Sequence, residues 1–236
     1  MSRLRGILGD PLLSVVMPVF NEAGTIEEIV RRVLAVPLRI QLVVVDDAST
    51  DGTRERLERL QGELGFTLAL QPRNQGKGAA LRRGFEEVRG DLVIVQDGDL
   101  EYSPEEFPML IDLICQGRAD VVYGSRFLGR HRVFLFSHYL GNRLLTLVTN
   151  VLYNTMLTDM ETCYKVMRVE VLRSIALRSN GFGIEPELTA KIFKRGYRVY
   201  EVPITYDGRG YEEGKKIGWR DGVVALWVLL KYRFTE

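Results

Sequence analysis

The chain has 236 residues, of which 46% are hydrophobic, and this is enough for a sizeable core in one large domain. Its formal net charge is +1, so no overall positive field suggests a nucleic-acid partner. Only two cysteines occur, without metal-ligand spacing, and no apolar run is long enough to span a bilayer, so we expect a cytoplasmic protein, soluble or peripheral on the cytoplasmic face of a membrane.

The first half of the chain alternates apolar strands with amphipathic helices. The expected strands are Leu12–Phe20, Ile40–Val45, Phe66–Leu70 and Leu92–Val95. Helices are expected from Thr25 to Pro37, from the Asp46–Thr53 turn to Leu60, after Asn74–Gly78, and from Ser103 to Ile114; Thr25/Glu28 and Ser103/Glu106 have capping-box spacing. Four strand–helix units predict an α/β fold, a mostly parallel sheet with helices on both faces and ligands bound at the strand ends.

Polar turns end these strands. They are Pro18–Glu22, Asp46–Asp51, Asn74–Lys77 and Asp97–Glu101. Turns are often polar whatever their function, and this explains the glycines and serines. It explains less well why acidic residues cluster after two very apolar strands.

Three acids follow the strand Leu92–Val95 at a spacing of two: Asp97, Asp99 and Glu101. In extended chain alternate residues share a face, so the three carboxyl groups are expected to converge. Mg²⁺ or Mn²⁺ is the natural counter-ion of such an oxygen cluster. A polar strand-to-helix turn would give the same spacing without a metal.

The second half is less regular. Val121–Arg126 reads as a strand that delivers an arginine to its end. The other expected elements are the apolar segment Val133–Leu157, which contains Arg143, a strand at Thr162–Arg168, a helix at Val169–Leu177, a helix that ends at Arg195, an edge strand at Tyr197–Thr205 with Pro203, a glycine-rich charged loop at Tyr206–Lys216, and an apolar helix at Gly218–Phe234.

Val133–Leu157 and Val223–Leu230 are more apolar than a soluble enzyme requires. Basic or aromatic residues border both segments, as is typical of amphipathic helices that lie in a membrane interface. Burial in the core or in a homodimer interface would explain the same pattern, and membrane contact could also come from a transmembrane partner subunit.

Several blocks, in this order, make the chain resemble family 2 glycosyltransferases of the GT-A fold, most closely the dolichol-phosphate mannose synthase and polyprenyl-phosphate glycosyltransferase branch. The blocks are Val16–Glu22, Val44–Thr53, Asn74–Gly78, Gln96–Glu101, Tyr123–Arg126, Asp159–Arg168 and Val202–Ile204. The resemblance implies one GT-A domain over residues 1–236, with a Rossmann-like sheet. It would comprise a nucleotide-sugar-binding half at 12–125, an acceptor half at 126–217, and a C-terminal apolar or interfacial helix at 218–236.

The resemblance also implies roles for individual residues. The nucleotide-sugar site would use Pro18, Val19, Phe20, Asn21, Glu22, Asp46, Asp47, Gly76, Lys77, Gln96, Asp97, Gly98 and Asp99. Asp97 and Asp99 would bind Mg²⁺ or Mn²⁺ and so carry the donor diphosphate, with Glu101 as a third ligand where the family commonly has glutamine. Arg126, Arg143, Arg209 and Lys215 or Lys216 would hold an acceptor phosphate; Asp97, Asp99 and Arg126 would be the catalytic residues.

The expected reaction is an inverting transfer of a sugar from GDP-mannose or a UDP-sugar to a polyprenyl phosphate. A hydroxyl acceptor would instead need a general base, and Glu185 or Glu187 would be the candidates. Both acids also suit a helix N-terminus without any catalytic role. A sugar nucleotidyltransferase is disfavoured, because the first strand ends in Pro18–Glu22 and not in a glycine-rich phosphate loop.

Overall fold

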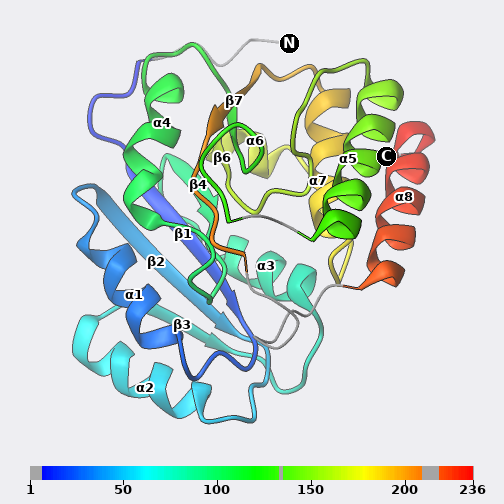
Figure 1. Cartoon of the computed structure of the whole chain (residues 1–236). Helices are drawn as coiled ribbons and strands as arrows, with labels where there is room; N and C mark the ends of the chain where they lie inside the picture. Colours follow the sequence, from blue (N-terminus) through cyan, green and yellow to red (C-terminus); the bar gives the residue numbers. More distant parts are fainter. Residues whose placement is uncertain (1–6, 133–134, 209–217, 236) are drawn as a thin grey trace.

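The computed structural model describes residues 7–132, 135–208 and 218–235, which fold around a single seven-stranded sheet (Figure 1). In chain order its elements are β1 (Leu12–Val19), α1 (Ile26–Ala35), β2 (Arg39–Asp46), α2 (Thr53–Leu64), β3 (Thr67–Leu70), α3 (Lys77–Phe85), β4 (Leu92–Val95), η1 (Pro104–Glu106), α4 (Phe107–Cys115), β5 (Val121–Ser125), α5 (Phe136–Tyr153), β6 (Lys165–Arg168), α6 (Val169–Arg173), α7 (Ile184–Lys194), β7 (Val199–Pro203) and α8 (Trp219–Phe234).

The strand order is β3-β2-β1-β4-β6-β5-β7. β1 pairs in parallel with β2 and β4, whereas β6 runs antiparallel to both of its neighbours, β4 and β5. The predicted α/β fold with a mostly parallel sheet is therefore confirmed. β7 lies at an edge, as Pro203 predicts, because proline cannot donate a hydrogen bond to a neighbouring strand.

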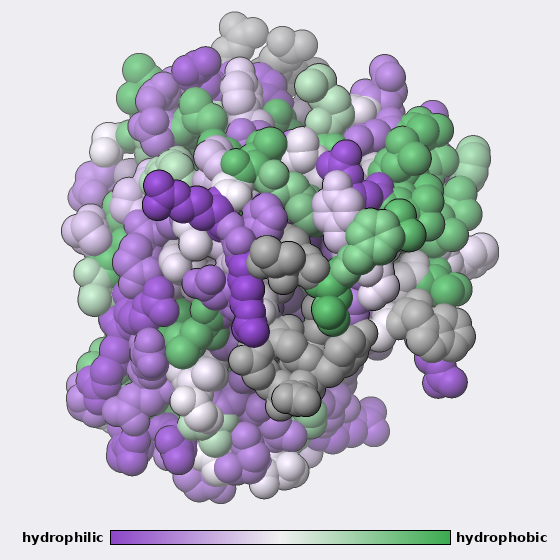
Figure 2. All heavy atoms as spheres, in the orientation of Figure 1, coloured by the Kyte–Doolittle hydropathy of each residue, from purple (hydrophilic) through white to green (hydrophobic). Residues whose placement is uncertain are grey.

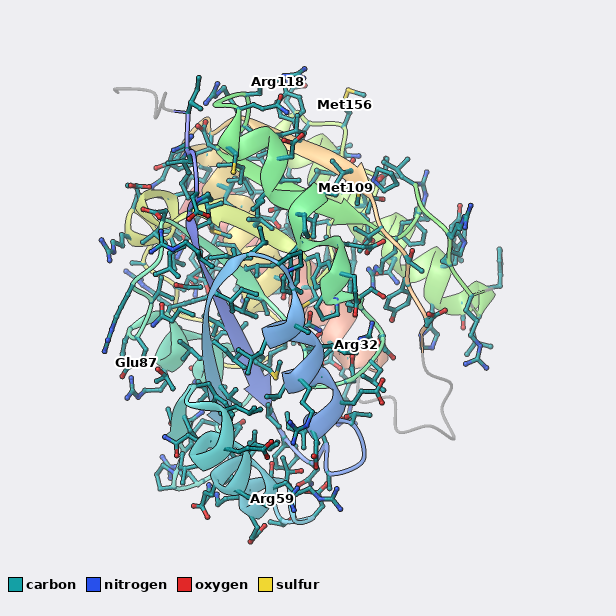
Figure 3. All side chains as sticks on the ribbon, turned by 90° about the vertical axis from the view of Figure 1, so that its left-hand side faces the viewer. Arg32, Arg59, Glu87, Met109, Arg118 and Met156 are labelled. Carbon is teal, nitrogen blue, oxygen red and sulfur yellow. The ribbon has the colours of Figure 1, made fainter. Side chains whose placement is uncertain are left out.

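Helices cover both faces of the sheet. α1, α2 and α4 lie on one face, and α3 and α7 lie on the other, with α5 and α8 outside them (Figures 1 and 3). Every residue of β4 is buried, which explains its uninterrupted apolar run. On the first face, Arg32 of α1 pairs with Glu105 of η1 at 2.8 Å and so ties two helical segments together (Figure 3).

The two predicted capping boxes are wrong. Neither Thr25 nor Ser103 makes a side-chain cap hydrogen bond. The Thr25 hydroxyl donates instead to the carbonyl oxygen of Gly98, at 2.9 Å. This bond anchors the start of α1 to the loop after β4, so the local capping pattern serves a long-range contact.

The predicted apolar segments form α5 and α8, which pack against each other. The hydroxyl of Tyr153 in α5 donates to the carbonyl oxygen of Leu229 in α8, at 2.7 Å. Among the described residues, no helix is both long and apolar enough to cross a membrane. One sheet contains strands from both predicted halves, and the division between residues 125 and 126 stays a prediction.

Candidate active site at the carboxyl edge of the sheet

The polar turns after β1, β2 and β4 meet at one edge of the sheet. Val19 of β1 lies opposite Asp46 of β2, and Val16 lies opposite Val95 of β4. The backbone of Gln96 then donates to Val16, at 3.0 Å. β1 lies between β2 and β4, so the order of strands reverses here, which is where open α/β sheets bind ligands.

The turns after β1 and β2 are hydrogen-bonded to each other. The backbone nitrogen of Asn21 donates to the Ser49 hydroxyl at 2.9 Å, and that of Thr50 donates to Asn21 Oδ1 at 2.8 Å. Asn21 and Ala48 have φ angles of 53° and 61°, which are uncommon for residues other than glycine. The surrounding bonds hold this strained backbone, a feature that clusters at ligand-binding sites.

Asp46 and Asp47 bind their own chain. Asp46 is fully buried and pairs with Arg54 at 2.8 Å. The Asp47 carboxylate accepts hydrogen bonds from the backbone nitrogens of Gln75 and Gly76, at 2.8 and 2.7 Å. Burial raises the pKa of Asp47, although these two bonds oppose the rise. Both acids therefore shape the turns around the site, and Asp47 places the loop that begins α3.

Several other residues predicted to contact the donor also make contacts within the protein. The Gln96 side chain is buried and accepts a hydrogen bond from the Tyr164 hydroxyl, at 2.6 Å. Val19 is buried as well, and a Cβ on Gly98 would lie 3.3 Å from its Cγ2. Pro18, Phe20, Asn21 and Glu22 remain partly exposed at the same edge. The edge thus combines a buried frame with a partly exposed rim.

A chain of alternating charges crosses the site. Lys77, at the start of α3, lies 2.7 Å from Asp97 Oδ1 and 3.8 Å from Glu185 Oε1. The other oxygen of Glu185 lies 2.5 Å from Lys165 Nζ. Burial alone would lower the pKa of Lys77, but the charges of Asp97, Cys163 and Glu185 raise it well above its ordinary value. The ammonium of Lys77 is therefore firmly charged.

The expected convergence of all three acids after β4 is wrong. β4 ends at Val95, so the acids lie in a bent segment and not along one strand face. Glu101 Oε2 accepts a hydrogen bond from the Tyr206 hydroxyl at 2.7 Å, and Asp99 Oδ1 accepts one from the Glu101 backbone at 3.1 Å. In the described part of the chain, no three His, Cys, Asp or Glu side chains are grouped to hold a metal ion.

Asp97 and Asp99 nevertheless fit a hard divalent cation. Their carboxylate oxygens are the donor type that Mg²⁺ and Mn²⁺ prefer. Asp97 already attracts a cation, the Lys77 ammonium, at 2.7 Å. Asp99 follows two residues later, and its exposed fraction is 7%. The pair is therefore retained as the candidate metal site, while Glu101 is committed to Tyr206.

Arg126 follows β5 as predicted, but its guanidinium is held by Asp159. Nε and Nη2 of Arg126 each lie 2.7 Å from one Asp159 oxygen, and the arginine backbone nitrogen adds a third bond at 3.0 Å. Nη2 also donates to Asn142 of α5, at 3.3 Å. Burial opposes the charge of Arg126, but Asp159 raises its pKa well above the ordinary value.

The other predicted phosphate anchors are not brought to Arg126. Arg143 is exposed on α5 and has no ion-pair partner among the residues that the structure describes. Arg209, Lys215 and Lys216 lie outside the described residues. Convergence of these side chains on one acceptor phosphate stays a prediction.

The two candidate general bases differ sharply. Glu187 is fully buried and accepts hydrogen bonds from the backbone nitrogens of Arg178 and Ser179 and from Lys191 Nζ. Burial would raise its pKa, but these bonds hold the value below its usual range. Glu187 is thus a structural anchor of the loop before α7. Glu185 Oε1, by contrast, is buried and makes no hydrogen bond.

The sequence reasoning missed the partners that come from the segment before β6. Because β6 is antiparallel to its neighbours, Asp159, Glu161, Cys163 and Lys165 arrive at the same edge as the strand ends. Burial raises the pKa of Glu161 to about 7, a rise that Lys165 opposes. The available signal was Lys165 itself, a charged residue that stands between Tyr164 and Val166 at the start of a strand.

A model of one protein family, "Glycosyl transferase family 2", matches residues 14–176. Among curated proteins, the chain is 33% identical over 219 residues to the low-salt glycan biosynthesis hexosyltransferase Agl6 of Haloferax volcanii; this match covers 89% of the chain and 52% of the relative. It is 31% identical over 212 residues to the dolichol-phosphate mannosyltransferase of Pyrococcus furiosus, covering 87% of the chain and 59% of that protein. The chain thus spans between half and two thirds of the length of these relatives.

A solved structure has the same fold. Glucosyl-3-phosphoglycerate synthase from Mycobacterium tuberculosis, crystallised with Mn²⁺, uridine diphosphate and phosphoglyceric acid, superimposes with a TM-score of 0.74. The match covers 96% of this chain and 80% of the synthase, at 22% sequence identity. At this identity the likeness establishes the GT-A fold.

Proposed function

Since the chain belongs to glycosyltransferase family 2, and is therefore a glycosyltransferase, we propose that it transfers a sugar from a nucleoside diphosphate to a polyprenyl phosphate. The donor would be GDP-mannose or a UDP-sugar, and the transfer would invert the configuration at the anomeric carbon of the sugar. Two relatives support the acceptor class by their names. One is the dolichol-phosphate mannosyltransferase of Pyrococcus furiosus, and the other is the dodecaprenyl-phosphate galacturonate synthase of Rhizobium johnstonii, which is 28% identical over 211 residues.

The donor is proposed to bind where the turns after β1, β2 and β4 meet. Asn21 and Glu22 on the partly exposed rim would face the base and ribose, in a frame set by Asp46 and Asp47. Asp97 and Asp99 would hold Mg²⁺ or Mn²⁺. When bound, such a cation would stabilise the charge that develops on the diphosphate leaving group.

The observation that carries the acceptor proposal is the link between Arg126 and α5. Arg126 Nη2 donates to Asn142 on the inner side of α5, at 3.3 Å, and the opposite side of the same helix carries an exposed apolar row. The row has helical spacing and consists of Phe136, Leu140, Leu144, Leu147 and Val151, which are 55% to 74% exposed. A polyprenyl phosphate joins the same two chemistries, an anionic head and an apolar tail.

α8 extends this apolar surface, and we propose that the combined face contacts a membrane. Its exposed side chains include Val223, Trp227 and Phe234. Figure 2 shows apolar side chains gathered over the part of the molecule formed by α5 and α8. A contiguous apolar surface of this kind marks an interaction site, and Trp227 is a typical interfacial anchor. A homodimer or a transmembrane partner subunit would cover the same face.

A phosphate acceptor removes the need for a general base. Its second pKa is about 6, so it is already a nucleophilic anion at neutral pH. This agrees with the structure around Glu187, which is bonded to its own loop. A hydroxyl acceptor is the second candidate, because the unbonded Oε1 of Glu185 resembles a base awaiting a proton.

A panel of GDP- and UDP-sugars tests the proposal. Each labelled sugar is incubated with a short polyprenyl phosphate and Mn²⁺, and the label is followed into the organic phase. We expect one donor to give a labelled lipid in the presence of the metal. If no donor labels the lipid and a soluble hydroxyl compound is glycosylated, the lipid-phosphate proposal is wrong.

A further inference from the structure

Lys77 lies between two carboxylates, and only one of them is hydrogen-bonded to it. Its Nζ is 2.7 Å from Asp97 Oδ1 but 3.8 Å from Glu185 Oε1. That Glu185 oxygen is buried and accepts no hydrogen bond, whereas its Oε2 is paired with Lys165. Leaving a buried carboxylate oxygen without a donor is costly, so this oxygen calls for an explanation.

The start of α3 and the loop before α7 pack closely against each other, and these two segments position Lys77 and Glu185. A Cβ on Gly78 would lie 2.4 Å from the Ser179 carbonyl oxygen, so the two backbones touch. The Ala79 nitrogen donates to Asn180 at 2.9 Å. Asp97 belongs to a different segment, the loop after β4. Packing therefore fixes the backbone positions of Lys77 and Glu185 relative to each other, independently of that loop.

We propose that Lys77 is an exchangeable counter-cation, which neutralises Asp97 until a divalent cation binds there and then pairs with Glu185 Oε1. An ammonium and a divalent cation repel each other when they share one carboxylate. A lysine is a point charge on a flexible stem, so it moves more readily than a guanidinium held at two points. Glu185 is then a positioning residue for Lys77 and not a base. The inference rests on the proposed metal site at Asp97 and Asp99.

Binding of Mn²⁺ to the full chain tests the exchange directly. Free Mn²⁺ is counted by electron paramagnetic resonance, without nucleotide, so that a contact of Lys77 with a diphosphate does not enter the measurement. Lys77→Met removes the competitor and should lower the Kd of Mn²⁺ roughly tenfold, on the scale of one charge-assisted hydrogen bond. Glu185→Gln removes the second partner of the displaced ammonium and should raise the Kd by about threefold to tenfold.

Two controls isolate the effect. Lys194→Met on α7 and Glu58→Gln on α2 make the same chemical changes at exposed positions away from Lys77, and should leave the Kd within about twofold of the wild type because distant sites act independently. In the double variant, Glu185→Gln should not change the Kd of Mn²⁺ beyond the change that Lys77→Met makes alone. An effect that came only from the lost pair between Glu185 and Lys165 would persist without Lys77. If Glu185→Gln does not fold, Glu185→Asp keeps the charge near Lys165 and should also raise the Kd.

The outcomes separate this inference from the metal site. Mn²⁺ bound by the wild type, lost in Asp97→Asn and unchanged in the Lys77 and Glu185 variants would overturn the exchange and leave the metal site standing. An equal effect of Glu185→Gln with and without Lys77 would overturn it as well. Absence of Mn²⁺ binding in both the wild type and Lys77→Met would overturn the metal site and the exchange together.

Discussion

Two of the cation–carboxylate pairs at the carboxyl edge of the sheet, Lys77–Asp97 and Arg126–Asp159, are built differently. Asp97 is held by a lysine through one contact of 2.7 Å, and that lysine has a second carboxylate within 3.8 Å. Asp159 accepts hydrogen bonds from Nε and Nη2 of Arg126 and from the backbone nitrogen of the same arginine. The first pair is able to exchange partners, whereas the second is a fixed part of the frame. The difference distinguishes Asp97, the proposed metal ligand, from Asp159, which is part of the folded frame.

Removing the charge of Asp97 should have the largest effect on transfer. Asp97→Asn is expected to lower the rate by roughly a hundredfold or more, because metal stabilisation of a leaving group is worth several kcal/mol. EDTA should do the same to the wild type, and added Mn²⁺ or Mg²⁺ should restore it. Asp112→Asn, at an exposed position of α4, is the matched control and should leave the rate unchanged. Full activity in EDTA would contradict the metal assignment.

The two pairs should differ in what they contribute to the free energy of unfolding. Arg126→Met should cost about 3 kcal/mol or more, because it leaves the buried Asp159 carboxylate without its partner. Lys77→Met should cost only about 1 kcal/mol, since Asp97 remains partly exposed to water. Urea denaturation followed by circular dichroism measures both values. Equal costs would remove the distinction between an exchangeable and a fixed pair.

Charging the apolar face should affect the acceptor side alone. Leu144→Asp and Trp227→Asp lie at exposed positions, so both variants should fold and bind the donor nucleotide normally. Each should weaken binding to anionic lipid vesicles by roughly tenfold, because each removes one large apolar side chain from the interface. Met109→Asp on α4, on the opposite side of the molecule, is the control (Figure 3).

Vesicle flotation and sedimentation velocity together distinguish the possible occupants of this face. Loss of flotation in the two α5 and α8 variants agrees with membrane contact. Unchanged flotation, with a wild-type dimer that both variants convert to a monomer, would show that a second copy covers the face instead.

The smallest expected effect concerns Glu161, whose charge is coupled to both Lys165 and Arg126. Burial raises the pKa of Glu161 to about 7 in the folded protein. The folded state therefore holds this proton more tightly than the unfolded state, and stability falls as the pH rises from about 4.5 towards 7. Glu161→Gln should raise the melting temperature by a few degrees at pH 8 and by little at pH 5. An equal difference in melting temperature at pH 5 and pH 8 would show that ionisation of Glu161 does not cause the effect.

The sequence predicts the parallel part of this sheet well, because the signals for each strand and the turn after it lie within one short segment. β4 occupies Leu92–Val95 as the apolar run predicts, and parallel strands bring their polar ends together without further knowledge. The pair between Arg126 and Asp159 was not predictable in the same way, since 33 residues separate the partners and β6 must run antiparallel to join them. Glu101 shows the same limit, because its partner Tyr206 is 105 residues away.

Capping patterns failed for a related reason. Thr25 and Glu28 have the spacing of a capping box, but spacing does not reveal that the Gly98 carbonyl lies within 2.9 Å of the Thr25 hydroxyl. The Thr25 hydroxyl therefore bonds to a residue distant in sequence and not to a backbone nitrogen of its own helix. The exposed apolar rows of α5 and α8 were recognisable as unusually apolar, yet only the fold shows that both helices lie outside the sheet layers (Figure 1).

The most direct test compares two acceptors that differ only in the terminal phosphate group. Sugar transfer to polyprenyl phosphate and to the corresponding polyprenol is measured with saturating donor and Mn²⁺, from pH 6 to pH 9. We expect transfer to the phosphate alone, with a rate that changes little above the acceptor's second pKa of about 6, because the nucleophile is already an anion. Faster transfer to polyprenol, abolished in Glu185→Gln at every Mn²⁺ concentration, would contradict this expectation and establish Glu185 as the base.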